Sequence, residues 1–191
     1  MSRLDLVVGP NGAGKSSFVA AVLRPALPPG TPFVNADEIA KARFPGEEMR
    51  RSREAAVIAE ATRDALLDRG LPFIAETVFS HPSKLDLVDR AVAGGYYVRL
   101  HVLAIPSHLA VQRVRYRVEA GGHDVPPPKV TQRWERLWPL VADAIRRADR
   151  AEVWDNSRHQ VTDKVAEFVG GLSVSPPRWP EWVPSSLREL A

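Results

Sequence analysis

The stretch that decides the fold is LDLVVGPNGAGKSSFVAAVL, which spans residues 4–23. Its apolar run at 4–8 predicts a buried strand, and the spacing of apolar residues over 15–23 predicts a helix. Between them lies the spacing G-x-x-x-x-G-K-S/T, which in this context forms a phosphate-binding loop, or P-loop. The residues that carry the pattern are Gly9, Gly14, Lys15 and Ser16. The stretch therefore predicts a protein that binds a nucleoside triphosphate.

The P-loop residues are expected to bind phosphate and metal through different groups. Glycine lets backbone N–H groups wrap a phosphate chain, and the N-terminus of the following helix favours negative charge. Lys15 is expected to reach the β and γ phosphates, and the Ser16 hydroxyl to bind Mg²⁺. We therefore expect ATP and Mg²⁺ as cofactors, with a nucleotide site made by Gly9, Pro10, Asn11, Gly12, Ala13, Gly14, Lys15, Ser16 and Ser17.

Apolar runs and helical patterns alternate beyond the P-loop. Further strands are expected at 33–36, 73–75, 97–105 and 152–154, and further helices at 47–69, 84–93, 107–120, 130–148 and 161–169. This alternation predicts an α/β fold with a five-stranded parallel sheet and helices on both faces. Residues 1–172 would form a single P-loop kinase domain with a helical lid at about 113–136, and the Pro- and Trp-rich tail at 173–191 would dock on it.

Composition restricts the functional classes. The 191 residues are 45% hydrophobic and 26% charged, with a net charge of +3 in which acids are interleaved with bases. Without a basic aromatic stripe we expect no nucleic-acid binding, and without a run of about 18 uncharged apolar residues we expect no membrane span. The absence of cysteine excludes disulfides and thiolate metal sites. Since the start does not resemble a signal peptide, we expect a cytoplasmic protein.

Motifs of several other P-loop classes are missing. The sequence has no Asn-Lys-x-Asp motif of GTPases, no Leu-Ser-Gly-Gly-Gln signature of transporter ATPases, and no apolar strand that ends in Asp-Glu as in motor ATPases. Small-molecule kinases of this superfamily instead place an acid after the second strand, and here that strand ends FVNADE. Asp37 is expected to be the base that orients the acceptor hydroxyl. Alternatively, Asn35 or Asp37 caps a helix that begins there.

A second acid follows the third expected strand, which ends FIAET. Because the carboxyl ends of parallel strands meet at one edge of a sheet, Glu76 and Asp37 should both face the P-loop. We expect Glu76 to bind Mg²⁺ or the substrate and Thr77 to bind the substrate. A plain strand-end position is the alternative for Glu76.

Several stretches together resemble the zeta-toxin family of P-loop kinases. They are GPNGAGKSS, NADEIA, ETVFS, GGYYVRLHVL, the arginines that flank GGHDVP, and WDNS. The resemblance implies transfer of the ATP γ-phosphate to the 3′-hydroxyl of the amino sugar in UDP-N-acetylglucosamine, and a small antitoxin partner that blocks the nucleotide site. It also implies catalytic roles for Lys15 and Asp37 and a site role for Glu76. Glu60 would match a substrate-binding acid, for which a solvated helix residue is the alternative.

The lid is expected to carry arginines that stabilise the transferred phosphoryl group as the site closes. Arg113 and Arg117 lie one helical turn apart, and so do Arg133 and Arg136. The resemblance implies that Arg117 and Arg133 are the two catalytic lid arginines, with the other two as nearby substitutes. The alternative for each is an exposed arginine on a solvated helix face.

Two further positions complete the expected site. His123 at the lid tip has no second ligand at metal spacing, so a substrate contact or a loop hydrogen bond is expected. Asn156 or Arg158 would contact adenine, with a capped turn as the alternative. The sequence thus predicts a zeta-toxin-like kinase of a small hydroxyl acceptor. The alternatives are a kinase of another small alcohol, as in antibiotic phosphotransferases, or a nucleotide-dependent switch ATPase.

Overall fold

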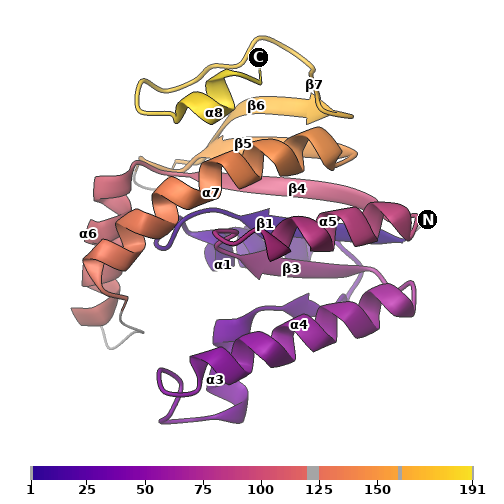
Figure 1. Cartoon of the computed structure of the whole chain (residues 1–191), viewed down its shortest axis with the longest axis vertical. Helices are drawn as coiled ribbons and strands as arrows, with labels where there is room; N and C mark the ends of the chain where they lie inside the picture. The colour runs from indigo at the N-terminus through magenta and orange to yellow at the C-terminus, as the bar shows by residue number, and fades with distance from the viewer. Residues whose placement is uncertain (1, 120–124, 159–160, 191) are drawn as a thin grey trace.

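The computed structural model describes residues 2–119, 125–158 and 161–190, and its centre is one twisted sheet (Figure 1). Within these residues the sheet has seven strands in the order β2-β3-β1-β4-β5-β6-β7. The first five in this order pair in parallel, whereas β6 runs antiparallel to β5 and β7 antiparallel to β6. The strands are β1 Arg3–Val8, β2 Phe33–Val34, β3 Phe73–Thr77, β4 Tyr97–Ala104, β5 Arg150–Asp155, β6 Asp163–Val169 and β7 Leu172–Ser173.

Helices connect the parallel strands. The first connection is a continuous helical path of α1, the π-helical turn η1 and α2. The helices are α1 Lys15–Phe18, η1 Val19–Leu23, α2 Arg24–Ala26, α3 Ala36–Arg43, α4 Ser52–Asp68, α5 Ser83–Ala93, α6 Ser107–Glu119, α7 Pro127–Arg147 and α8 Ser185–Arg188. No helix in the described part of the chain combines the length and the apolar character that crossing a membrane would require.

Alternation along β1 separates two hydrophobic layers. Leu4, Leu6 and Val8 point into the layer that contains α5 and α7, whereas Val7 points into the layer that contains α1, η1 and α6. Figure 1 shows α4, α5 and α7 in front of the sheet and α1 behind it. In the sheet, β2 and β3 lie on one side of β1, and β4 and β5 lie on the other. The strand order therefore changes direction at β1. The carboxyl end of β1 is therefore the position where ligands bind in sheets of this type.

The predicted α/β P-loop fold is confirmed, but the predicted number of five strands is wrong. The five parallel strands are present, and β6 and β7 extend the sheet beyond β5. Residues 161–169, predicted as a helix, instead contain β6, in which Ala166 and Phe168 are buried. A short apolar segment fits either periodicity, and here the pairing with β5 decides for a strand.

The segment after β7 packs on the rest of the chain. Val183 and Leu187 are buried in the same core as α7, and Trp179 and Trp182 pack against that core. The Trp182 side chain lies beside α6 and α7 in a groove that it helps to line. The division of the chain at residue 172 stays a prediction.

A cluster of titratable side chains is buried on the face of the sheet that α1 covers. Nε2 of His101 lies 3.0 Å from Oδ1 of Asp5, and its Nδ1 lies 3.4 Å from Oε2 of Glu152. All three side chains are at most 3% exposed, and the Phe18 ring of α1 lies 5.5 Å from the imidazole ring. Burial alone would raise the pKa of Glu152, but the nearby His101 and a hydrogen bond from Arg99 lower it to about 2. His101 thus links three neighbouring strands beneath the helix that follows the P-loop.

Candidate functional site

The P-loop turn depends on glycine at two close contacts. Gly9 has a φ of 150°, and a Cβ at this position would lie 2.2 Å from the backbone oxygen of Leu103. Gly14 has a φ of 84°, and its Cβ would lie 2.6 Å from Nδ2 of Asn156. At Gly9 the backbone of Leu103 leaves no room for a side chain, whereas at Gly14 the positive φ disfavours other residues and a side chain would displace the amide of Asn156.

Lys15 is the buried cation of the site. It is 8% exposed, and its Nζ donates a hydrogen bond of 3.0 Å to the backbone oxygen of Pro10. Burial lowers the pKa of Lys15, whereas the nearby carboxylates of Glu76 and Asp37 act to raise it. The charge of Arg117 acts on the same group. Lys15, Asp37, Glu76 and Arg117 therefore lie within electrostatic reach of one point at the carboxyl end of β1.

Ser16 and Glu76 bring a hydroxyl and a carboxylate together beside the P-loop. The Ser16 hydroxyl donates to the Glu76 carboxylate, with distances of 2.9 and 3.1 Å to its two oxygens. Within the described ranges, no group of three or more His, Cys, Asp or Glu residues could hold a metal ion. Mg²⁺ in nucleotide sites commonly uses one or two protein oxygens together with phosphate oxygens and water. The hydroxyl and the carboxylate therefore fit a nucleotide-bound Mg²⁺.

Asp37 lies in the first turn of α3 and its side chain is exposed. The cap of this helix is Asn35, whose Oδ1 accepts hydrogen bonds from the backbone N–H of Asp37 at 2.7 Å and of Glu38 at 3.4 Å. Of the two residues considered as caps, Asn35 therefore holds the helix end. The carboxylate of Asp37 remains available for another task, and its charge acts on Lys15.

Thr77 supports the turn that follows β3. Its Oγ1 accepts a hydrogen bond of 3.3 Å from the backbone N–H of Phe79. Phe79 has a φ of 62°, the only positive φ of a non-glycine residue within the described part of the chain, and its side chain is buried. Backbone strain of this kind is found where a structure holds a residue in a fixed conformation, often at functional sites. A substrate contact of Thr77 stays a prediction.

The four arginines predicted for the lid differ in position. Arg113 and Arg117 lie half-buried on α6, and Nη1 of Arg113 is 3.4 Å from the backbone oxygen of Gly12. On α7, Arg133 is half-buried and Arg136 is exposed. Arg113, predicted only as a substitute, thus contacts the P-loop directly. Ala120 to Asp124, including the candidate His123, lie outside the described residues.

Asn156 braces the P-loop from the end of β5. Its Nδ2 donates a hydrogen bond of 2.8 Å to the backbone oxygen of Ala13, and its Oδ1 accepts one of 2.7 Å from the Thr162 hydroxyl. Arg158, the other candidate for an adenine contact, forms an ion pair with Asp163. The sequence contains no local signal for the role of Thr162, because it depends on how β6 follows β5. Adenine contact by Asn156 stays a prediction.

The other candidates lie around this centre. Pro10 accepts the Lys15 hydrogen bond, Ala13 is buried, and Ser17 is exposed on α1. Oδ1 of Asn11 is buried without a hydrogen-bond partner in the described structure. Glu60 is exposed on α4. Its neighbour Arg63, which the sequence analysis did not single out, is buried and lies four residues after Ala59 on the apolar stripe of that helix.

Comparisons with solved structures show the same fold at low sequence identity. The AvrRxo1-ORF1:AvrRxo1-ORF2 complex with sulphate ions matches with a TM-score of 0.71 and 18% identity, over 99% of this chain and 63% of that chain. The PezAT toxin-antitoxin system of Streptococcus pneumoniae matches with 0.60 and 14%, over 87% and 71%. The Pnkp1/Rnl/Hen1 RNA repair complex matches with 0.58 and 23%, over 74% and 46%.

The chain thus spans less than two thirds of the AvrRxo1 chain that it matches. A search of curated proteins finds no match.

A family profile matches most of the chain. The profile is described as an AAA domain and covers residues 4–140, from β1 through the P-loop and α4 to the first half of α7. This range includes the P-loop, Asp37, Glu76 and the lid arginines. Since the match covers more than half of the chain, the chain belongs to this AAA domain family, AAA_33.

Proposed function

We propose that the chain is an ATP-dependent phosphotransferase that transfers the γ-phosphate to a hydroxyl group of a small molecule, the acceptor. The observation that carries this proposal is the group around Lys15, whose charge interacts with those of Glu76, Asp37 and Arg117. A P-loop lysine, two carboxylates and an arginine at one sheet edge provide what phosphoryl transfer requires, namely positioning and compensation of negative charge. The solved complex of AvrRxo1-ORF1 and -ORF2 with ATP has the same fold and supports ATP as the donor.

In the proposed reaction Asp37 accepts the proton of the acceptor hydroxyl as its oxygen attacks the γ-phosphorus. The bond between the γ-phosphorus and the β,γ-bridging oxygen breaks, and ADP leaves with the electron pair of that bond. The acceptor becomes a phosphate ester, and the proton resides on Asp37 until water removes it. An exposed carboxylate can exchange this proton readily, which suits the position of Asp37.

The remaining residues would compensate the charge of the phosphates. Lys15 would turn from the Pro10 carbonyl to the β and γ phosphates, and the backbone of Gly9 to Gly14 would donate N–H groups. Arg117 and Arg133 would approach the transferred group from the lid. Ser16 and Glu76 would hold Mg²⁺, which supplies further neutralisation of the phosphate oxygens.

For the acceptor we propose a nucleotide sugar such as UDP-N-acetylglucosamine, as the zeta-toxin resemblance implies. The PezAT structure belongs to a chromosomal toxin-antitoxin system, and this supports an antitoxin as a partner of the present chain. A small alcohol without phosphate, as used by antibiotic phosphotransferases, is the competing acceptor class. A switch ATPase would need no acceptor at all.

The test is Asp37→Asn, assayed with γ-labelled ATP and thin-layer separation of UDP-N-acetylglucosamine and other alcohols. We expect label on the acceptor with the wild-type chain and about 10²- to 10⁴-fold slower transfer with the variant, while ATP affinity stays unchanged. Glu38→Gln is the matched control, because Glu38 is the neighbouring exposed acid of the same helical turn. If Asp37→Asn transferred the label as fast as the wild type does, Asp37 would not be the base. ATP hydrolysis without any labelled acceptor would favour the switch.

A further inference from the structure

A buried arginine on α4 has no counter-ion at contact distance. Arg63 is 7% exposed and continues the buried stripe of Ala55 and Ala59, which faces the sheet. Among the described residues, its guanidinium forms no hydrogen bond and no ion pair within 4.0 Å. Burying a charge without such a partner costs stability. The guanidinium nitrogens of Arg63 are not among the described polar atoms that are fully buried without a partner, so they keep access to solvent and are open to a ligand.

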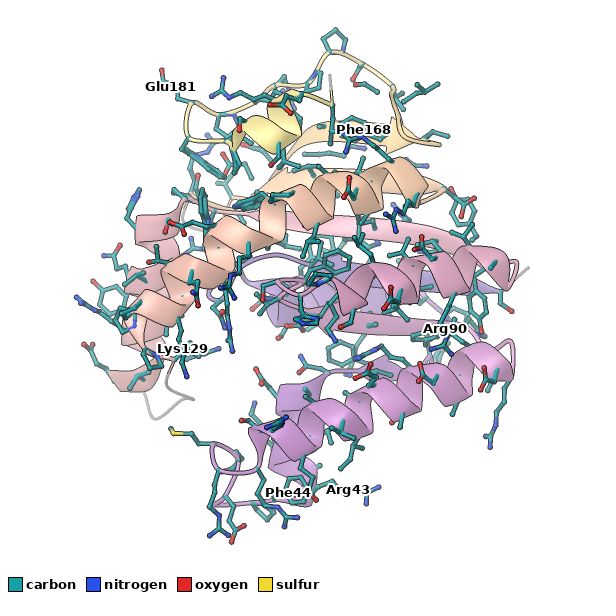
Figure 2. The ribbon with its side chains drawn as sticks, viewed as in Figure 1. Arg43, Phe44, Arg90, Lys129, Phe168 and Glu181 are labelled. Carbon is teal, nitrogen blue, oxygen red and sulfur yellow. The ribbon has the colours of Figure 1, made fainter. Side chains whose placement is uncertain are left out.

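A second cation, Lys84, lies close to Arg63. Helix α4 precedes β3 and α5 follows it, so both helices run opposite to this strand and parallel to each other. Arg90 of α5 fixes their alignment, since its Nη1 lies 2.7 Å from Oδ1 of Asp64; Figure 2 shows Arg90 between the two helices. Lys84 lies six residues before Arg90 in α5, which corresponds to about 9 Å along the helix. This places Lys84 beside the part of α4 that carries Glu60 and Arg63.

The balance of charge around these two cations is positive. Lys84 is half-buried, and within the described chain its side chain has no hydrogen bond or ion pair at contact distance. Burial lowers its pKa first, and the neighbouring charge of Arg63 lowers it further, while Glu60 acts in the opposite direction. Glu60 and Asp64 both act on Arg63, but Asp64 pairs with Arg90, so Glu60 is the carboxylate that faces the two cations without an ion pair of its own among the described residues.

Lys84 lies on the acceptor side of the proposed reaction, and Arg63, which precedes Asp64 in the sequence, lies near the level of Arg90 and farther from the P-loop edge. Lys84 belongs to the first turn of α5, which begins shortly after the carboxyl end of β3, the strand that positions Glu76. An acceptor whose hydroxyl meets Asp37 would extend from the P-loop toward this turn. Arginine offers a planar fork and lysine a compact charge, a combination that suits the oxygens of a phosphate group.

We propose that Arg63 and Lys84 form an anion subsite that binds a phosphate or diphosphate group of the acceptor. The acceptor class is then a phosphorylated alcohol, and neutral alcohols are excluded as preferred substrates. This inference rests on the proposed transfer to a hydroxyl acceptor and names the second group that the acceptor carries. Glu60, beside the two cations, would accept a hydrogen bond from a hydroxyl of the same molecule.

The test uses inorganic pyrophosphate as the probe and calorimetry as the readout. The full chain is first saturated with Mg²⁺ and a non-hydrolysable ATP analogue, so that the P-loop is filled. We expect one further pyrophosphate to bind, and we expect Arg63→Gln and Lys84→Gln each to weaken it by about tenfold or more. Arg53→Gln is the matched control, since Arg53 is an exposed arginine of the same helix, and it should bind as the wild type does.

Several outcomes would overturn the subsite. The subsite is wrong if the nucleotide-loaded wild type does not bind pyrophosphate, or if both variants bind it as tightly as the wild type. It is also wrong if the wild type binds malonate more tightly than pyrophosphate, which would indicate a carboxylate ligand. Lys84→Gln keeps the test valid if Arg63→Gln does not fold, because Lys84 is only half-buried. Binding that depends on Arg63 and Lys84 in a chain that labels no acceptor would refute the proposed function and leave the subsite intact.

Discussion

Two groups of polar residues, one at the carboxyl edge of the sheet and one buried against its face, have different surroundings. At the carboxyl edge, Asp37 of α3 and Ser16 of α1 are exposed beside the buried Lys15, and the side chain of Asp37 does not serve as the helix cap. Against the face, His101 and its two carboxylates are at most 3% exposed and face one another. Exposed groups can exchange protons and partners with little cost, whereas buried polar groups are held by each other. The first group is therefore suited to chemistry and the second to structure.

The largest effect is expected in the candidate site at the carboxyl edge of the sheet. Arg117→Ala should reduce turnover about 10³-fold, equivalent to about 4 kcal/mol of transition-state stabilisation, because an arginine that meets the transferred phosphoryl acts mainly in the transition state. The affinity for ATP and the free energy of unfolding should change little. Label transfer, ATP binding and denaturant unfolding measure the three quantities. Arg115→Ala, an exposed arginine on the same helix, is the control. Similar turnover for both variants would argue against a catalytic lid arginine.

The buried cluster should respond in the opposite way. His101→Leu should lower the free energy of unfolding by about 3 kcal/mol, because it leaves the carboxylates of Asp5 and Glu152 buried without their shared partner. Turnover per folded molecule should stay close to the wild-type value. Replacing all three cluster residues by leucine should restore most of the stability in denaturant titrations.

Lys41→Ala provides the comparison for an exposed pair. It removes a 3.1 Å ion pair with Glu38 and should cost less than about 1 kcal/mol. A loss of equal size in Lys41→Ala and His101→Leu would contradict the distinction between buried and exposed charges.

The buried cluster should also respond to acid. The pKa of Glu152 is lowered from 4.5 to about 2, so the folded state binds this proton less readily than the unfolded chain does. The resulting stability is fully present above about pH 4.5 and is lost as the pH falls toward 2. Asp5 acts in the same direction, since its pKa is also lowered. The stability difference between the wild type and Glu152→Gln should therefore narrow between pH 6 and pH 3 in denaturant titrations. A constant difference would exclude this linkage.

The sequence predicted the P-loop half of the fold better than the last third. A strand, the glycine pattern and a helix are local, so residues 4–23 define their own conformation. Whether 161–169 forms a helix or a strand depends instead on the neighbouring β5, and the sequence pattern predicted the wrong element. Asn35 was recognised as a cap candidate because capping is also local.

The same limit applies to the candidate site. Parallel strands bring their carboxyl ends together, so Asp37 and Glu76 could be assigned to the P-loop edge from strand order alone. The contact of Arg113 with Gly12 and the hydrogen bond of Asn156 to Ala13 join segments that are far apart in the chain. No periodicity contains this information. The burial of Arg63 could have been found, because it continues the spacing of Ala55 and Ala59.

The bond between Asn156 and Ala13 also bears on where this chain can be cut. The family match ends at residue 140, yet the brace of the P-loop comes from Asn156, which Thr162 in turn holds in place. The central sheet likewise obtains Val153 and Phe168 from beyond that limit. An expression fragment that stops at the family boundary would therefore lack part of the nucleotide loop's own support. We therefore expect the smallest fragment that folds to be longer than the stretch that defines the family.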